Sequence, residues 1–351
     1  MSPNRNILVA LLVSGATLLL AGCEHPPVAH EQIGYRGTGM ERIVNPRTVA
    51  ANAALHEAPE AAPAVPADGP KATLLYKNLQ VLGDLNVAEF NRTMAAMTQW
   101  VAPEQGCAHC HNPANFAEDS KYTKVVARRM IQMTRQINGN WQDHVKETGV
   151  TCYTCHRGHN IPEKSWFAER EVATEGRLLG NNFGQNRAGM ASVANASLPY
   201  DPYTPYLLKA NEIRVAGTTA LPTGNKTSIK DAEATHGLMI HMSDALGVGC
   251  TWCHNTRAMA EWSQSTPQRV QAWFGIRMVR EINNEYIVPL TAVTPPDHLG
   301  PTGDIAKANC ATCHQGANKP LNGAAMAKHY PALAGAAKPA DTLAERKAGK
   351  N

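Results

Sequence analysis

Cys-x-x-Cys-His is the feature that most constrains this chain, because it occurs four times in 351 residues. Two thiols at this spacing can form thioether bonds with one porphyrin, and the adjoining imidazole then becomes an axial ligand of its iron. The motif therefore predicts four covalently bound c-type haems. The predicted haem residues are the thioether cysteines Cys107, Cys110, Cys152, Cys155, Cys250, Cys253, Cys310 and Cys313 and the axial histidines His111, His156, His254 and His314.

Zinc sites and dithiol redox centres are the alternative interpretations of paired cysteines. The four copies use eight of the nine cysteines, and a His follows the second Cys in each of them. Neither a zinc ribbon nor a disulfide requires His at that one position. The repetition therefore favours a tetrahaem protein.

The ninth cysteine, Cys23, follows a sequence typical of a secretion signal. A single charge, Arg5, precedes a largely apolar run over residues 7–20, which ends in Leu-Ala-Gly before the cysteine. Such a run is short for a membrane span, and small residues before a cleavage site are typical of a signal peptide. We expect residues 1–22 to be a lipoprotein signal peptide and Cys23 to be acylated; an uncleaved anchor helix is the alternative. In both cases the protein is tethered outside the cytoplasmic membrane.

Composition sets further bounds on fold and partners. With five Phe but 27 Gly and 23 Pro, the chain is expected to be rich in loops and poor in conventional core. The apolar faces of four porphyrins would supplement that core, so loss of haem should mean loss of fold. The formal charge of +4 includes no basic patch that would indicate a nucleic-acid partner.

An internal duplication divides the haem-binding part into two halves. Residues 110–118 align with 253–261 without a gap, and residues 131–138 align with 276–283 after a two-residue shift. A repeat of this length indicates a pair of related halves rather than a solenoid. The predicted fold is mainly α and loop-rich, with two pseudo-twofold-related halves that each bind two c-type haems.

The sequence predicts six segments along the chain. They are the signal peptide 1–22, an N-terminal anchor and linker segment 23–70, a first dihaem half 71–165, a connector 166–230, a second dihaem half 231–325, and a tail 326–351 that we expect to be disordered.

Local signals predict where some elements begin. Ser120 is the expected N-cap of a helix in the first half, and Ser265 or Thr266 caps its counterpart with Pro267 in the first turn. The connector is expected to be ordered, with a short strand over Glu212–Val215.

Methionine pairs are the candidate sixth ligands of three haems. They are Met94 and Met97, Met130 and Met133, and Met239 and Met242. Core packing is the alternative, because methionines three residues apart share a helix face and fill gaps. In the alignment of the halves Met133 pairs with Met278, but Met130 pairs with Gly275. If the first Met of each pair is the ligand, the fourth haem needs a donor from elsewhere.

His144 is the leading candidate for that donor. It follows Met130 by 14 residues, so a continuous helix would place it about 21 Å further along the same face. From there it could reach a different haem and join the two halves, although the Asn-Gly-Asn sequence at 138–140 favours a helix end. Other candidates for the fourth sixth ligand are Met278, His298 and His241.

These motifs resemble the tetrahaem cytochrome c subunit family of the purple-bacterial photosynthetic reaction centre, from Cys23 to about Gly323. The motif spacings, the duplication, the lipoprotein cysteine and the stretch Gly34–Met40 all fit. The resemblance implies Met94, Met130 and Met239 as ligands of the first, second and third haems, and His144 as a ligand of the fourth.

The resemblance also implies function. Members of this family are electron-transfer proteins, not enzymes, and hold their haems as a wire on the periplasmic face of the L and M subunits, which associate with H. The haem of the third motif lies nearest the special pair of bacteriochlorophylls, which the wire re-reduces. A soluble cytochrome c or a high-potential iron–sulfur protein supplies electrons at the far end. A lipid anchor would hold the subunit on the photosynthetic inner membrane.

Two other functions fit the motifs alone. One is a lipid-anchored tetrahaem cytochrome of a respiratory chain. The other is a multihaem reductase, which needs an iron with an open coordination position. Because every haem here has a credible sixth ligand, the sequence argues against the reductase.

Overall fold

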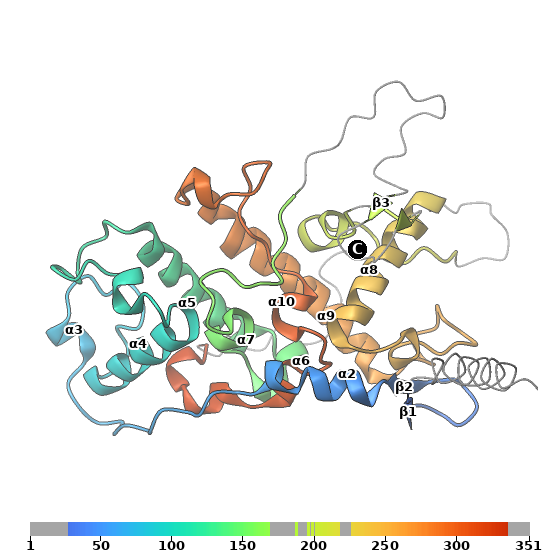
Figure 1. The fold of residues 1–351 in the computed structure, drawn as a ribbon, viewed down its shortest axis with the longest axis horizontal. Helices are drawn as coiled ribbons and strands as arrows, with labels where there is room; N and C mark the ends of the chain where they lie inside the picture. Colours follow the sequence, from blue (N-terminus) through green and yellow to red (C-terminus); the bar gives the residue numbers. More distant parts are fainter. Residues whose placement is uncertain are drawn as a thin grey trace, which may run out of the picture.

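The computed structural model describes residues 27–168, 187–188, 195–196, 198–199, 201–217 and 226–335. These parts of the chain are mainly helical, with long loops and short strands (Figure 1). The mainly α, loop-rich class is therefore confirmed. The predicted signal peptide, Cys23 and residues 336–351 lie outside the described residues.

The elements around the haem motifs occur in the same order in two parts of the chain. In each part a long helix precedes a turn of helix at one motif, and a second long helix precedes a short helix at the next. The first part contains α4 (Val87–Val101), η2 (Gly106–His109), α5 (Tyr122–Asn140) and α7 (Cys152–His156). The second contains α8 (Ile229–Leu246), η5 (Cys250–Trp252), α9 (Pro267–Glu281) and α10 (Cys310–His314).

Capping side chains fix the starts of two of the long helices. The Asn86 side chain accepts a hydrogen bond from the N–H of Glu89 at the start of α4. Ser228 and Asp231 form a reciprocal capping box at the start of α8. Helix α9 begins as predicted, with Thr266 at the N-cap and Pro267 in the first turn.

Helix α5 begins one residue later than predicted. Its N-cap is Lys121, not Ser120, and this cap makes no side-chain hydrogen bond. The start is fixed instead by the first haem motif. Thr123 Oγ1 donates to the carbonyl of His109 at 2.6 Å, and Lys121 Nζ donates to that of Ala108. Tertiary contacts here override the local capping preference.

Helix α5 ends at Asn140, and a separate short helix, α6 (Gln142–Val145), follows it. The Asn138 side chain donates to the carbonyl of Val150 and accepts from its N–H, so it ties the end of α5 to the segment that leads into the second motif. His144 lies on α6. Helix α5 therefore ends where the Asn-Gly-Asn sequence favours an end, and His144 does not continue its face.

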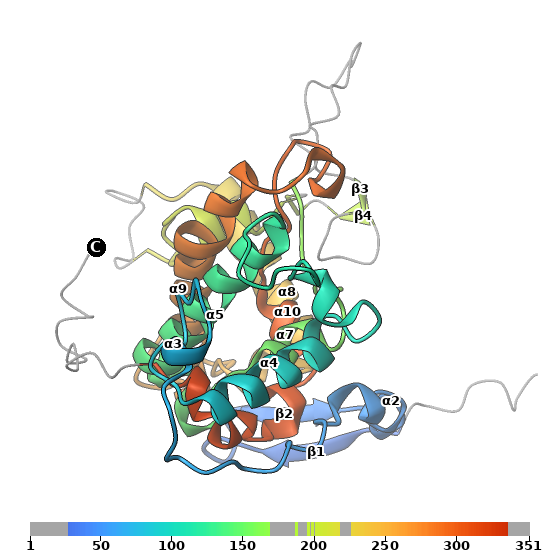
Figure 2. The same ribbon diagram turned by 90° about the vertical axis from the view of Figure 1, so that its left-hand side faces the viewer.

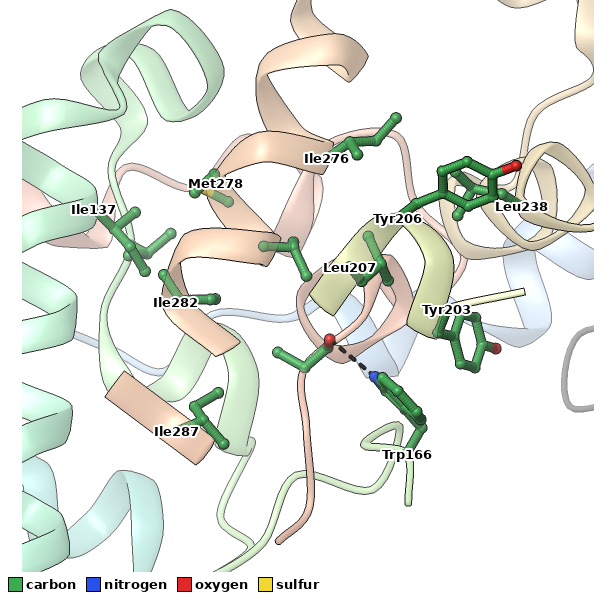
Figure 3. Packing of buried hydrophobic residues seen from close by; sticks show 13 residues of the cluster. Ile137, Trp166, Tyr203, Tyr206, Leu207, Leu238, Ile276, Met278, Ile282 and Ile287 are labelled. Carbon is green, nitrogen blue, oxygen red and sulfur yellow. Dashed lines mark hydrogen bonds between the residues drawn. The ribbon is translucent and has the colours of Figure 1, made fainter. Parts of the chain in front are cut away.

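A cluster of buried apolar residues joins the connector to the second part of the chain. Figure 3 shows Tyr206 and Leu207 of the connector with Leu238 of α8 and Ile276 of α9. Trp166 completes this side of the cluster and donates its indole N–H to the carbonyl of Ala308 at 3.2 Å.

The connector contains a helical turn and lacks the strand that was expected further along it. The turn is η4 (Thr204–Leu208), which starts where Asp201 Oδ1 accepts from the N–H groups of Tyr203 and Thr204. Residues Glu212–Val215 form neither strand nor helix, so the predicted strand is absent. The aromatic residues of this segment are buried, and burial rather than strand pairing orders it.

Two antiparallel strand pairs occur in the described residues. Strand β1 (Ala29–Gln32) pairs with β2 (Glu41–Val44), with Ala29 opposite Val44, and β3 (Arg187–Ala188) pairs with β4 (Asn195–Ala196). Figure 2 shows β1, β2 and α2 along one edge of the helical body. The remaining short elements are α2 (Pro46–Ala51), η1 (Ala53–His56), α3 (Ala72–Leu75), η3 (Lys146–Thr148), η6 (Ile282–Ile287), η7 (Val288–Ala292), η8 (Pro296–His298), η9 (Pro320–Gly323), η10 (Met326–His329) and η11 (Pro331–Leu333).

The segment from residue 326 is ordered as far as residue 335, so the predicted start of a disordered tail at 326 is wrong. The Tyr330 ring packs edge-on against Trp100 of α4, with centroids 4.6 Å apart, and the Arg92 guanidinium lies 4.2 Å from its centroid. The Tyr330 hydroxyl accepts from the N–H of Ala62 at 3.1 Å. Apolar burial that composition does not reveal therefore fixes this segment onto the first half.

In the part of the chain that the structure describes, no helix is both long and apolar enough to cross a membrane.

Candidate haem sites

The four motif histidines share one hydrogen-bonding arrangement. In the first and third motifs the Nδ1 atom lies close to the carbonyl oxygen five residues ahead: His111 to Phe116 at 3.2 Å and His254 to Met259 at 2.9 Å. A carbonyl can only accept, so Nδ1 carries the proton and donates. The lone pair then lies on Nε2, which is the arrangement that a histidine iron ligand needs.

The second and fourth motifs achieve the same result with a carbonyl three residues ahead. His156 Nδ1 donates to His159 at 2.8 Å, and His314 Nδ1 donates to Ala317 at 2.9 Å. The motifs thus fall into two geometric types, and each half of the chain contains one of each type. This matches the duplication seen in the sequence.

Local structure explains the two types. The second and fourth motifs are short helices, α7 and α10, that begin with reciprocal capping boxes formed by Thr151 with Thr154 and by Asn309 with Thr312. A residue with left-handed backbone ends each of these helices directly after the histidine. The first and third motifs form the 3-10 turns η2 and η5 instead. The spacing of the two cysteines is therefore held by helical backbone in all four cases.

Burial keeps the motif histidines neutral. It lowers the pKa of His111, His156 and His254, while their backbone hydrogen bonds act in the opposite direction. For His314, burial and the nearby His144 lower the pKa to about 4. A neutral imidazole is the form that binds a metal, so these residues fit an iron ligand at neutral pH.

A large cavity of about 1250 Å³ lies among the candidate ligands of the first half. Ligand pockets for single small molecules usually measure ~300–1,000 Å³, so this cavity is large enough for a ligand of porphyrin size. The lining includes both motif histidines of the first half and both members of its two methionine pairs. The residues present therefore fit porphyrins. All four methionines line the cavity, so the lining does not show which member of each pair would bind iron.

In the second half Met239 and Met242 are partly buried and pack against the apolar cluster of Figure 3. They come from α8, which precedes the third motif. This is the place that α4, with Met94, occupies before the first motif. The position of the pair in the element order is thus the same in both halves.

His144 lies beside the histidine of the fourth motif. The His144 and His314 rings are 6.0 Å apart between centroids, with an angle of 68° between their planes. His144 Nδ1 donates to the carbonyl of Gln271 at 2.9 Å, and the Gln271 amide donates back to the His144 carbonyl at 2.7 Å. His144 is therefore held against α9 with its Nε2 lone pair available, as a ligand of the fourth iron requires.

Gly275 makes room for this histidine. A Cβ atom added at Gly275 would lie 2.6 Å from His144 Cε1, which is closer than carbon atoms approach one another. Gly275 is the residue that pairs with Met130 in the alignment of the two halves. The His144 ring from the first half thus lies beside the position where the alignment of the halves would put a methionine. The sequence contains this signal in the pairing of Gly275 with Met130.

The competing candidates for the fourth sixth ligand lie in different surroundings. Met278 is buried in the apolar cluster. His298 is about half exposed and lies beside Tyr122. His241 is buried with its Nδ1 near the Tyr203 hydroxyl at 3.2 Å, and its Nε2 has no hydrogen-bond partner. Of the four candidates, His144 is the one in ring contact with His314.

The two halves meet at the second and fourth motifs. Helix α7 packs on α4, α10 packs on α8, and α7 and α10 pack on one another. Figure 1 shows α7 and α10 between α4 and α8. The order of the candidate sites through the molecule is therefore first, second, fourth, third.

Sequence reasoning missed the charged residues that hold the motif loops. The Arg157 guanidinium donates to the carbonyl of Cys313 at 3.2 Å, and it also donates to the carbonyl of Leu55. Lys124, on the buried side of α5, binds the loop that follows the first motif. Lysine and arginine are seldom buried without partners, but a sequence alone does not say which ones are buried.

Comparisons with known proteins agree with these observations. Residues 24–334 match the family model described as photosynthetic reaction centre cytochrome C subunit. The chain is 55% identical over 319 residues to the photosynthetic reaction center cytochrome c subunit of Rubrivivax gelatinosus, covering 91% of this chain and 87% of that protein. The protein of the same name from Thermochromatium tepidum is 51% identical over 335 residues, covering 95% and 82%. That of Roseobacter denitrificans is 42% identical over 345 residues, covering 93% and 92%.

Proposed function

Since the chain belongs to the photosynthetic reaction centre cytochrome c subunit family, it is an electron-transfer subunit of a reaction centre and not an enzyme, and we propose that it carries electrons over four covalently bound haems. Each bound haem iron would take up and release one electron. The observation that carries the count of four is the shared arrangement of the four motif histidines, each of which holds Nδ1 on a carbonyl and leaves Nε2 for an iron.

We assign two axial ligands and two thioether cysteines to each site. The sites are Cys107, Cys110, His111 and Met94; Cys152, Cys155, His156 and Met130; Cys250, Cys253, His254 and Met239; and Cys310, Cys313, His314 and His144. The ring contact of His144 with His314 and the space at Gly275 support the fourth set. The choice of the first Met in each pair rests on the family resemblance and on the alignment with Gly275.

These ligands would give unequal potentials along the molecule. A thioether sulfur raises the reduction potential of a haem relative to a second imidazole. Three sites would pair Met with His, and the fourth would pair His144 with His314. The fourth site, which the packing of α7 and α10 supports as an inner position, would therefore have the lowest potential of the four if all else were equal.

The N-terminal segment supports one orientation on the membrane. Strand β2 contacts the third motif, where Thr251 Oγ1 donates to the carbonyl of Glu41 at 2.7 Å. Residue 27 is four positions after Cys23, and four residues span at most about 14 Å. A lipid on Cys23 would hold this end of the molecule near the periplasmic face of the membrane. The third site would then be nearest the L and M subunits and their special pair, in a complex that also contains H.

The first site would receive electrons at the other end, from a soluble cytochrome c or a high-potential iron–sulfur protein. The multihaem reductase is disfavoured because each proposed iron has two protein ligands and no open position. The family membership disfavours a respiratory chain as the destination of the electrons.

Purification from photosynthetic membranes tests this proposal. Affinity purification of the chain should yield bacteriochlorophyll-containing L and M subunits, and intact mass should show four haems and an acylated N-terminus at Cys23. Recovery without bacteriochlorophyll would contradict the partner, fewer than four haems would contradict the relay, and an N-terminus at Met1 would contradict the lipoprotein anchor.

A further inference from the structure

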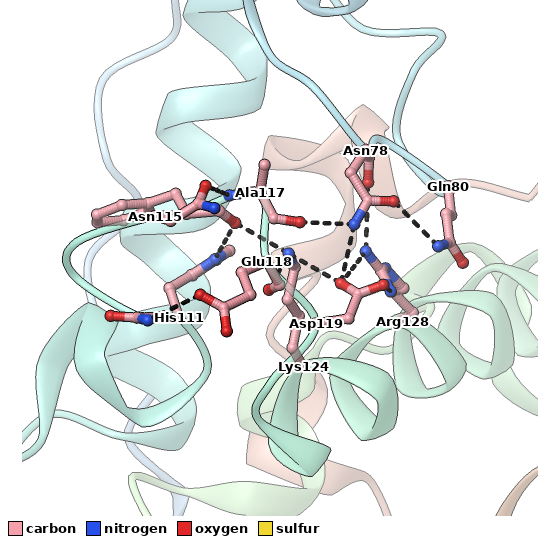
Figure 4. Close-up of polar contacts among 11 residues, drawn as sticks. Asn78, Gln80, His111, Asn115, Ala117, Glu118, Asp119, Lys124 and Arg128 are labelled. Carbon is pink, nitrogen blue, oxygen red and sulfur yellow. Dashed lines mark hydrogen bonds and ion pairs between the residues drawn. The ribbon is translucent and has the colours of Figure 1, made fainter.

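Lys124 is a buried cation beside the first motif, and its contacts are unusual. Its side chain is 9% exposed, and the residue borders the large cavity of the first half. The ammonium donates to the carbonyls of Phe116 at 2.9 Å and Glu118 at 2.8 Å, and it lies 3.0 Å from Asp119 Oδ1 (Figure 4).

The carbonyl of Phe116 is also the acceptor that holds the axial histidine. His111 Nδ1 donates to it at 3.2 Å, while the corresponding distances in the other three motifs are 2.8 to 2.9 Å. One carbonyl oxygen therefore serves both a charged donor and a neutral donor. A hydrogen bond from an ammonium is the stronger of the two, so it draws electron density away from the imidazole hydrogen bond.

The second half contains the same position without the same contact. Arg269 aligns with Lys124, and its guanidinium donates to Ser265 Oγ at 2.7 Å and to the carbonyl of Ala260 at 3.4 Å. The carbonyl of Met259, which accepts from His254, is not one of these partners. The cation shared with an axial histidine is thus a property of the first site and not a general result of the duplication.

We propose that Lys124 tunes the first haem site, by sharing the Phe116 carbonyl with His111, and raises the reduction potential of the iron that His111 would bind. Two effects act in the same direction. A weaker hydrogen bond at Nδ1 makes the imidazole a poorer donor to ferric iron, and a buried positive charge disfavours the ferric state. The proposal rests on the proposed function only in taking His111 as an axial ligand.

The charge of Asp119 allows a second test, in which the reduction potential should shift in the opposite direction. Asp119 accepts two hydrogen bonds from Arg128, both at 2.9 Å, and pairs with Lys124. These contacts, with Arg128 foremost, hold the pKa of Asp119 well below its usual range, so the carboxylate is charged at neutral pH. Its negative charge partly offsets Lys124. Removing it should therefore raise the potential of the same haem.

Haem-resolved redox titration of the purified holoprotein tests the proposal. Lys124→Gln should shift the reduced-to-oxidised ratio of the first haem about tenfold toward the oxidised form, equal to 59 mV for one electron, and leave the other three midpoints in place. Asp119→Asn should shift the same haem in the opposite direction. Lys124→Arg should keep most of the effect, because it retains the charge.

Lys121→Gln is the matched control, because Lys121 carries the same charge three residues away but donates to the carbonyl of Ala108. Its shift should be less than a third of that of Lys124→Gln. Equal shifts would overturn the shared-carbonyl role. Shifts of Lys124→Gln and Asp119→Asn in the same direction would indicate a role in loop folding alone and would also overturn the proposal. Fewer than four midpoints in the unaltered protein would instead contradict the proposed function.

Discussion

Each proposed iron ligand depends on a neighbouring residue that fixes its orientation. The motif histidines are held by backbone carbonyls within their own loops. His144 is held by Gln271 of α9, a residue from the other half of the chain. A lone histidine on a short helix has little orientation of its own, so this reciprocal pair of hydrogen bonds makes His144 a usable donor.

Replacing His144 by Met tests its role directly. If His144 binds the fourth iron, His144→Met should move one haem to a higher potential, because a thioether favours ferrous iron over a second imidazole. The parallel change Met130→His should lower a different haem. Both are measured by redox titration resolved by haem. Four unchanged midpoints in His144→Met would make His144 a structural residue.

Gly275 provides a second test at the same site. Ala is a better helix former than Gly by about 1 kcal/mol, so Gly275→Ala should stabilise α9 if nothing lay beside it. We expect destabilisation by at least that amount instead, because the added Cβ would meet the His144 ring. Denaturant unfolding of the unaltered protein and of Gly275→Ala measures this difference in the free energy of unfolding.

His144→Ala provides the control for that experiment, because it removes the ring. In that background Gly275→Ala should no longer destabilise, and Gly275→Met should restore a sulfur ligand to the fourth haem. A destabilisation by Gly275→Ala that persists without the ring would mean that another contact is responsible.

At the scale of elements, the N-terminal and C-terminal segments hold the first half together. The Ala/Pro-rich segment at residues 57–70 lies on α4, where Arg92 donates to the carbonyls of Ala62 and Pro63. The segment from residue 326 packs on the same helix through Tyr330. Both segments have the composition of linkers. The first is ordered by the Arg92 side chain of α4, and the second by its own Tyr330 side chain, which packs on that helix.

Tyr330 should therefore contribute to stability far more than its sequence context suggests. Tyr330→Ala removes a fully buried ring and should cost about 3–5 kcal/mol of the free energy of unfolding. Tyr330→Phe loses only the hydrogen bond to Ala62 and should cost about 1 kcal/mol. Denaturant unfolding with the haems attached measures both, and similar small losses for the two variants would contradict the packing role.

At the scale of the whole molecule, the sequence predicted the parts that follow from repetition. The motifs, the order of the helices and the start of α9 could be read from residue spacing and capping. The contact of His144 with Gln271 and the start of α5 could not, because contacts between distant segments determine them. A local sequence pattern predicts the local backbone conformation. It does not show which residues from distant parts of the chain will contact that segment.

Full coordination of the proposed irons would be a property of the whole chain, since the fourth site would take ligands from both halves. With every iron bound by two protein ligands, the reduced protein should not bind carbon monoxide promptly. Absorbance spectra after addition of carbon monoxide test this. His144→Ala, which opens the fourth iron, should bind about one equivalent; prompt binding by the unaltered protein would contradict the ligand assignment and revive the reductase.

Flash photolysis of the purified reaction centre complex tests electron delivery most directly. With the haems reduced beforehand, a single saturating flash oxidises the special pair, and absorbance is followed at the bacteriochlorophyll and c-type haem bands. We expect the haem band to bleach with the same time constant as re-reduction of the special pair, and Gly275→Ala to leave that first electron unaffected because the proposed order places the third site nearest. Recovery of the special pair without any bleaching of the haem band would contradict the proposed relay.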